Sequence, residues 1–286
     1  MHRDSQPPRA ALRFFKAHGL GNDYLVVEEG GEWSLTPTAV RAVCHRTRGA
    51  GSDGIVWLGA GGPPFRLRMF NPDGSEFERS GNGLRVLASW LYRSGRVEGD
   101  PFPVEVGGDR VEMRVLAMEA GRYDVVVEMG RCSVEHEETF ALNAGDTLRL
   151  VRVSVGNPHA VVWGHPDPWI GTPTPEVLSH IGPRLAGHGA FEGGTNVQLA
   201  RVLADHRVEA LVWERGVGRT SASGTSACAV AASAVATGRI TPGEVEVRME
   251  GGTLHVQVDE SLHVRLRGPV QEVMTGELAA DLVANA

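Results

Sequence analysis

The chain has few cysteines, no long hydrophobic run and no basic cluster. Only three of its 286 residues are cysteines, and Cys44, Cys132 and Cys228 are widely spaced, so they predict neither a disulfide framework nor a metal-ligand pair. No stretch of about 18 apolar residues predicts a membrane-spanning helix. Residues 1–11 lack the apolar core of a signal peptide and are expected to be a short disordered lead-in. These absences favour a cytoplasmic protein with reduced thiols and no metal.

The charge balance also limits the choice of partners. The net charge is −7 with a pI near 5.9, which argues against nucleic acid or an anionic membrane as the main partner. The glycine-rich turn at residues 49–54 lacks both the P-loop lysine and the dinucleotide glycine pattern, so no nucleotide cradle is expected there. The 42% apolar and 22% charged residues are ordinary for a globular protein. The length allows two domains of about 140 residues.

Two similar stretches organise the sequence. Asn71 lies nine residues before Ser80-Gly81, and Glu214 lies nine residues before Ser223-Gly224. Each Ser-Gly pair opens an apolar run that predicts a helix, and a serine at that place is a good N-cap. The two pairs are 143 residues apart, half the length of the chain. Because a helix N-terminus binds anions, the repeat predicts two halves whose helix starts face one small pocket.

Alternating apolar and polar residues predict strands around each central helix. The helices are expected at residues 36–45, 83–93, 175–185 and 226–237. The strands are expected at residues 12–27 (a hairpin with a turn from His18 to Asp23), 55–58, 65–70, 104–134, 148–155, 160–163, 195–200, 208–214, 245–249, 254–258 and 262–267. The order of strands, loop, helix and strands occurs twice. We therefore predict an α+β fold of two pseudo-symmetric domains, each an antiparallel β-sheet wrapped around a central helix.

The domain boundary is expected in a charged segment of weak periodicity. We place the first domain at residues 12–132 and the second at residues 133–270. Residues 271–286 are expected to hold C-terminal strands that can return to the first domain. Such a second crossing would tie the two halves together.

Six motifs, in order, resemble those of diaminopimelate epimerases, and the resemblance extends from about Leu12 to Gly276. They are Lys16–Tyr24, Asn71–Ser75, Ser80–Arg85, Gly156–His159, Glu214–Gly218 and Gly224-Thr225. The resemblance implies an active site in the cleft between the two domains. It also implies epimerisation of LL- to meso-diaminopimelate, a step toward lysine and peptidoglycan precursors, without pyridoxal phosphate or any other cofactor and without a metal.

The largest departure from the family lies at its two catalytic bases. The family has cysteines where this chain has Ser80 and Ser223, which we take as the catalytic positions. A serine hydroxyl is far less acidic than a thiol, and a helix dipole worth about 0.3–2 kcal/mol cannot close that gap. The serines would therefore need a neighbouring base, for which His18 and His159 are the candidates, with His159 assigned as an auxiliary site residue. Epimerisation impaired by the two serines is the expectation.

Smaller departures occur elsewhere. The family usually carries glutamate where this chain has Arg219 and methionine where it has Ala17. Cys228 lies five residues beyond Ser223, inside the predicted helix. It is expected to be a small buried hydrophobic residue and not a displaced base.

The substrate-binding half of the predicted site is intact. In the family, side-chain amides and an Arg–Glu pair hold the distal amino-acid group of the substrate, because arginine matches a carboxylate and glutamate an ammonium group. The corresponding residues here, with the helix starts, are Asn22, Asn71, Gly81, Asn82, Asn157, Asn196, Glu214, Arg215, Gly224 and Thr225.

Three interpretations of the function stay open at this point. The chain can be a serine-substituted diaminopimelate epimerase, or a racemase, epimerase or lyase for another amino acid. The third interpretation is a non-catalytic protein that binds an amino acid on the same scaffold. In each case the expected partner is a small-molecule amino acid, and a homodimer is an open alternative for the assembly.

Overall fold

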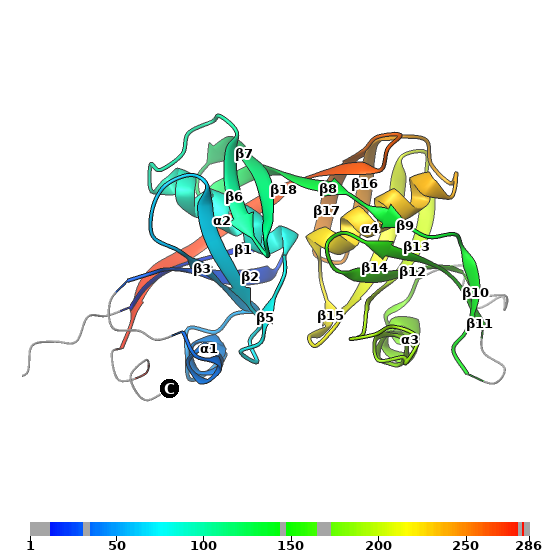
Figure 1. Cartoon of the computed structure of the whole chain (residues 1–286), viewed down its shortest axis with the longest axis horizontal. Helices are drawn as coiled ribbons and strands as arrows, with labels where there is room; N and C mark the ends of the chain where they lie inside the picture. The colour runs from blue at the N-terminus through cyan, green and yellow to red at the C-terminus, as the bar shows by residue number, and fades with distance from the viewer. Residues whose placement is uncertain (1–11, 31–34, 144–146, 165–172, 280–281, 283–286) are drawn as a thin grey trace, which may run out of the picture.

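The computed structural model describes residues 12–30, 35–143, 147–164, 173–279 and 282. The expected lead-in at residues 1–11 lies outside these ranges. Two lobes lie side by side, and each holds one central helix, α2 or α4 (Figure 1). The helices are α1 (Pro37–Cys44), α2 (Gly81–Arg93), α3 (Pro175–Ala186) and α4 (Gly224–Ala236). The strands are β1 (Leu12–Gly19), β2 (Asn22–Glu28), β3 (Gly54–Leu58), β4 (Phe65–Phe70), β5 (Glu76–Phe77), β6 (Phe102–Val106), β7 (Asp109–Glu119), β8 (Arg122–Arg131), β9 (Ser133–Val134), β10 (Glu138–Ala141), β11 (Thr147–Ser154), β12 (Pro158–Gly164), β13 (Asn196–Ala204), β14 (Arg207–Glu214), β15 (Gly218–Thr220), β16 (Gly243–Met249), β17 (Gly252–Val258) and β18 (His263–Leu278).

The predicted α+β fold in two similar halves is confirmed, and the repeat extends to the connections between strands. Most strand pairs are antiparallel. In the first half, α1 links the parallel strands β2 and β3, and α2 links the parallel strands β4 and β6. In the second half, α3 links β12 and β13, and α4 links β14 and β16 in the same way. Parallel neighbours need a crossover connection, so each half uses two helices and not one.

The first hairpin has a tighter turn than the sequence suggested. β1 continues to Gly19 and β2 begins at Asn22, so the turn holds two residues where we expected the six from His18 to Asp23. Leu20 and Gly21 both have positive φ, 55° and 92°, as two-residue hairpin turns require. The tight turn places Asn22 at the start of a strand and gives its side chain a defined direction.

Two long strands join the lobes. Figure 1 shows β8 and β18 running from one lobe to the other. β18 is longer than the expected strand at residues 262–267, because it pairs with one neighbouring strand after another along its length. It pairs with β17, then with β8, and residues 271–278 pair with β1. The expected domain boundary at residues 132 and 133 stays a prediction.

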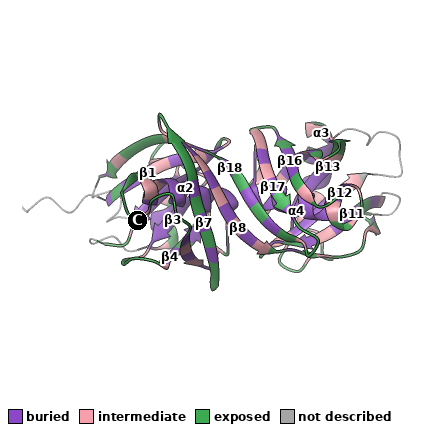
Figure 2. Cartoon of the chain, turned by 90° about the horizontal axis from the view of Figure 1, so that it is seen from above, coloured by how far each residue is buried: buried purple, intermediate pink, exposed green. Residues whose placement is uncertain are grey.

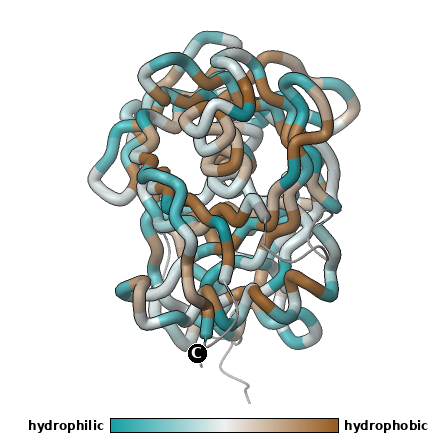
Figure 3. Tube along the Cα trace, turned by 90° about the vertical axis from the view of Figure 1, so that its right-hand side faces the viewer, coloured by the Kyte–Doolittle hydropathy of each residue, from teal (hydrophilic) through white to brown (hydrophobic). Residues whose placement is uncertain are grey.

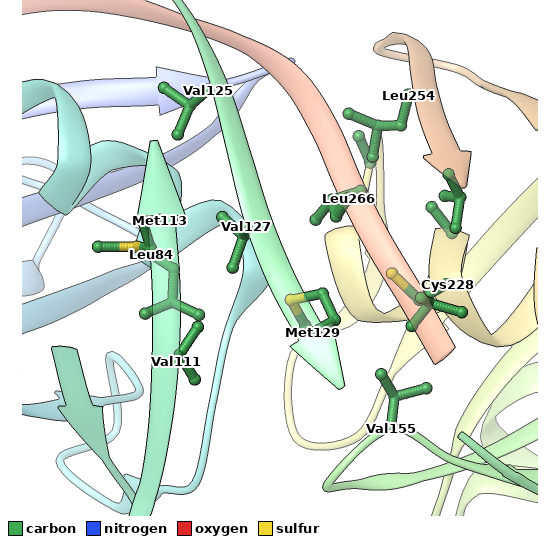
Figure 4. Packing of buried hydrophobic residues seen from close by; sticks show 14 of the residues in the cluster. Leu84, Val111, Met113, Val125, Val127, Met129, Val155, Cys228, Leu254 and Leu266 are labelled. Carbon is green, nitrogen blue, oxygen red and sulfur yellow. The ribbon is translucent and has the colours of Figure 1, made fainter. Parts of the chain in front are cut away.

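The central helices form the core. The residues of α4 from Gly224 to Ala234 are all buried, as its apolar composition on every side predicts. Figure 3 shows a helix inside a ring of strands, and Figure 2 shows the central helices as buried and many exposed residues along outer strands such as β7. One hydrophobic cluster spans both lobes along β8 and β18, with Val127 on one side and Cys228 and Leu266 on the other (Figure 4).

All three cysteines are buried, free thiols. Cys228 has no exposed surface and packs in the core, which confirms that it is a small hydrophobic residue. Burial raises the pKa of its thiol well above the usual value. In the part of the chain that the structure describes, no helix is long and apolar enough to cross a membrane.

Candidate active site

The two repeated serines cap the two central helices. The Ser80 Oγ accepts a hydrogen bond from Gly83 N at 3.1 Å, and the Ser223 Oγ accepts one from Ser226 N at 3.5 Å. Both serines have extended backbone, as N-cap residues do. The hydroxyl hydrogen of each serine stays available to a second partner, because only the oxygen is used by the cap.

The two helix starts meet across the lobes. A Cβ placed on Gly81 would lie 3.0 Å from Gly224 Cα, and one placed on Gly224 would lie 2.9 Å from Gly81 Cα. Only hydrogen fits between these backbones. The positive ends of both helix dipoles therefore converge on one place, which suits a bound carboxylate.

We expect Gly81→Ala to destabilise the protein by about 1–3 kcal/mol, because the added methyl group overpacks a contact between two backbones. Denaturant unfolding would measure the change. Gly99→Ala is the matched control, since a Cβ at Gly99 meets nothing within 4 Å and its φ is not positive. Equal stability of the two variants would show that the helix starts can separate without cost.

A pocket opens in front of these helix starts and is lined by both halves. Nine of its residues are predicted site residues: Asn22, Asn71, Ser80, Asn157, Asn196, Glu214, Arg215, Ser223 and Thr225. Six more lining residues were not assigned from the sequence: Tyr24, Asp53, Phe77, Glu78, Arg79 and Val217. The other predicted site residues, Gly81, Gly224, Asn82 and His159, are not among the lining residues. Among the described residues, no three His, Cys, Asp or Glu side chains gather to hold a metal ion.

Asn82 supports the pocket from behind. Its Nδ2 donates to Asn22 Oδ1 at 2.8 Å and to the Ala222 carbonyl at 3.1 Å, so it joins the lobes next to Ser223. The Asn82 Oδ1 accepts from Arg85 Nη2 at 2.6 Å. Arg85 is fully buried, and burial lowers its pKa to about 10. The predicted binding residue Asn82 thus positions Asn22 for the pocket.

His159 also acts behind the pocket. Its Nε2 lies 2.9 Å from Asn157 Oδ1, and its Nδ1 lies 3.0 Å from Gln198 Nε2. Burial lowers the pKa of His159 to about 3, so the ring is neutral at physiological pH. Both ring nitrogens are engaged by these amides, and among the described residues no hydrogen bond joins His159 to Ser80 or Ser223. The ring orients Asn157, which lines the pocket. His18, the other candidate base, accepts a hydrogen bond from Gly21 N instead.

Glu214 lines the pocket together with Ser223. It ends β14 and is half-buried at the pocket wall. Burial raises the pKa of its carboxyl group to about 7, against the lowering effect of the Ser223 hydroxyl, and the charge of Asp53 raises it further. A carboxyl group with this pKa is ionised in part at neutral pH, as a general base should be.

Asp53 reaches the pocket through the parallel pairing of β2 and β3. Its Oδ2 accepts from Asn22 Nδ2 at 3.0 Å, and Arg46 binds both Asp53 and Asp23. From the sequence, residues 49–54 were only a glycine-rich turn. The register that pairs Tyr24 with Gly54 is a long-range property, so the turn itself carried no signal of a site.

Charged residues of the pocket lining connect the two lobes. Arg79 Nη2 donates to the Val155 carbonyl of the other lobe at 2.7 Å. Arg215 Nη1 donates to the Gly193 carbonyl at 3.0 Å, and its Nη2 lies 3.9 Å from Glu78 Oε2. Glu78 and Arg79 directly precede Ser80 in the sequence, and this position could have predicted them as pocket residues. The Arg215 guanidinium therefore faces the pocket with only a long ion pair.

Comparisons with known proteins show the family to which the chain is similar. The family model described as diaminopimelate epimerase matches residues 14–135 and 151–279. A diaminopimelate epimerase of Desulforudis audaxviator is 39% identical over 283 residues, which cover 93% of this chain and 99% of that protein. Diaminopimelate epimerase 2 of Nostoc sp. is 35% identical over 290 residues, covering 96% and 98%.

Solved structures share the fold at lower identity. A probable proline racemase from Agrobacterium radiobacter has a TM-score of 0.75 at 18% identity, covering 94% of this chain and 93% of that one. A hydroxyproline epimerase from Agrobacterium vitis, solved with bound trans-4-hydroxy-L-proline, has a TM-score of 0.72 at 17% identity, covering 95% and 93%. The family match and the curated relatives span most of the sequence, and this chain therefore belongs to the diaminopimelate epimerase family of isomerases.

Proposed function

We propose that this protein inverts the α-carbon of diaminopimelate, converting the LL to the meso form without a cofactor. The observation that carries the proposal is the meeting of two helix N-termini, capped by Ser80 and Ser223, at one pocket wall. Inversion removes a proton from one face of the α-carbon and returns one to the other. A site with one capped helix start from each lobe offers a hydroxyl group to each face.

The site has the groups to stabilise the carbanion that inversion requires. When the α-proton leaves, negative charge spreads into the substrate carboxylate. The N–H groups and dipoles of α2 and α4 are fixed in place before the reaction, so they stabilise that charge without reorganisation. This argument needs only a carboxylate at the helix starts.

The rest of the pocket suits the distal amino-acid group. Asn157 and Asn196 come from the second lobe, and Asn22 and Asn71 from the first. Their amides are neutral donors and acceptors, while Arg215 offers a fork for the distal carboxylate. Asp53 and Glu78 add negative charge for an ammonium group. A long substrate with an amino-acid group at each end fits such a division. The three free thiols support a reducing compartment, and we place the reaction in the cytoplasm.

We expect the wild-type chain in D₂O to exchange the α-proton of LL-diaminopimelate and to form the meso isomer, slowly because both hydroxyl groups are weak acids. Proton NMR follows the exchange, and chiral chromatography follows the product. Ser94→Ala, at the opposite end of α2, should behave as the wild type, whereas Ser80→Ala should lose inversion. Tight binding without any exchange would favour the non-catalytic alternative, and exchange of another amino acid alone would favour the racemase alternative.

A further inference from the structure

The Ser80 side of the pocket contains a buried tyrosine. Tyr24 lies on β2, two residues after Asn22, and is only 6% exposed although it lines the pocket. Two glycines hold its ring: a Cβ on Gly54 would lie 2.6 Å from Tyr24 Cε1, and one on Gly83 would lie 3.4 Å from the same atom. The Cβ placed on Gly83 would also lie 3.4 Å from Ser80 Cβ. Tyr24 and Ser80 are therefore immediate neighbours at the start of α2.

The surroundings of Tyr24 keep its phenol protonated. Burial raises the pKa of Tyr24 far above its ordinary value, and the charges of Glu214, Asp53 and Asp23 raise it further. The Ser80 hydroxyl has the opposite, smaller effect on that pKa. Tyr24 is thus a proton donor at every physiological pH.

The two faces of the pocket differ in protonation. On the Ser223 face, Glu214 is a carboxyl group that ionises near neutral pH. On the Ser80 face, Tyr24 holds its proton. Inversion needs one unprotonated and one protonated group on opposite faces, and His159, which is engaged by two amides, supplies neither.

We propose that Tyr24 is the proton source for the Ser80 face and acts through the Ser80 hydroxyl, while Glu214 acts through Ser223 on the other face. This inference rests on the proposed function. It makes Tyr24 a positioning and proton-supplying residue for Ser80, a role that a phenylalanine could not fill.

The proton transfers balance without a further reactant. Ser223 Oγ takes the α-proton as its own hydroxyl proton passes to the Glu214 carboxylate, and the electron pair of the broken C–H bond stays on the α-carbon and its carboxylate. On the opposite face, Ser80 gives its hydroxyl proton to the α-carbon as the Tyr24 phenol passes its proton to Ser80 Oγ. The site then holds a protonated Glu214 and a Tyr24 phenolate. Exchange of protons with water restores both.

The charges of the two residues couple these steps. The ionised Glu214 is one of the charges that raise the pKa of Tyr24. When Glu214 gains the hydroxyl proton of Ser223, that charge disappears and the pKa of Tyr24 falls. The phenol therefore becomes a better donor at the moment when the carbanion needs a proton.

Tyr24→Phe in the full chain tests the inference, because it removes the hydroxyl and keeps the ring. We expect inversion to fall by about 10²–10⁴-fold. The diaminopimelate epimer whose α-proton faces Ser223 should still exchange in D₂O, and the other epimer should lose exchange by the same factor. Tyr123→Phe is the matched control, because Tyr123 is also buried but its hydroxyl lies at Glu272. It should leave both rates unchanged.

The pH profile separates a chemical from a structural role. The rate should rise through the pKa of Glu214, near 7, as the carboxylate forms. Ser223, Asp53 and Tyr24 face this group. Tyr24→Phe should keep this rise of the rate with pH, whereas Glu214→Gln should remove it. If Tyr24→Phe inverted diaminopimelate at the wild-type rate, the inference would be overturned and the proposed function would stand. The same conclusion would follow if Tyr24→Phe lowered the exchange rates of both epimers equally. A wild type inert toward both epimers would overturn the proposed function and this inference together.

Discussion

The double substitution S80C with S223C should raise α-proton exchange on diaminopimelate by several orders of magnitude. Both positions cap helices whose N-termini meet at the pocket. A thiol there gains a lowered pKa from the helix start, whereas a hydroxyl is too weak an acid to ionise with the same help. General acid–base catalysis contributes about 10²–10⁴-fold for a positioned group. Deuterium exchange measured by NMR would give the ratio.

Each single cysteine should restore less than the pair, because inversion needs a competent group on each face. Ser94→Cys places a thiol at the C-terminal end of α2 and is the matched control without an expected gain. In the double-cysteine background, Tyr24→Phe should cost less than in the wild type, since a thiol supplies its own proton. A double variant that binds diaminopimelate but exchanges no faster than the wild type would show that the serines are not displaced bases.

Arg215→Ala should weaken diaminopimelate binding by about 2–5 kcal/mol, roughly 30- to 5,000-fold in Kd. Asn196 Oδ1 accepts from Arg215 N at 3.0 Å, and the Gly193 carbonyl holds one guanidinium nitrogen. The other nitrogen lies 3.9 Å from Glu78, too far for a hydrogen bond. A substrate carboxylate could therefore bind it without breaking a close ion pair, and truncation would leave that carboxylate unpaired.

Titration calorimetry would measure the change in affinity. Arg219→Ala is the matched control, because Arg219 lies on β15 nearby, is exposed, and pairs with Glu250. It should bind diaminopimelate as the wild type does. If Arg215→Ala also binds with unchanged affinity, Arg215 does not hold the substrate, and the carboxylate must depend on the helix starts alone.

The sequence alone determined those features that depend on neighbours along the chain. A serine before a glycine and an apolar run marked the starts of α2 and α4 to within a residue or two, because capping is a local interaction. The apolar residues on every side of α4 predicted its burial, because they too are visible in the local sequence. The spacing of the two serines predicted that both would face one pocket.

Only the tertiary structure decided which polar groups stand beside the serines. Asp53 reaches the pocket because β3 pairs in parallel with β2, and Arg79 contacts Val155 because the lobes meet there. His159, one of the two candidate bases from the sequence, instead bonds to the side chain of Asn157. Tyr24 and Glu214 instead line the pocket together with Ser80 and Ser223. Strand register and the docking of two lobes set these contacts, and both are decided by packing across the whole chain and not by any local pattern.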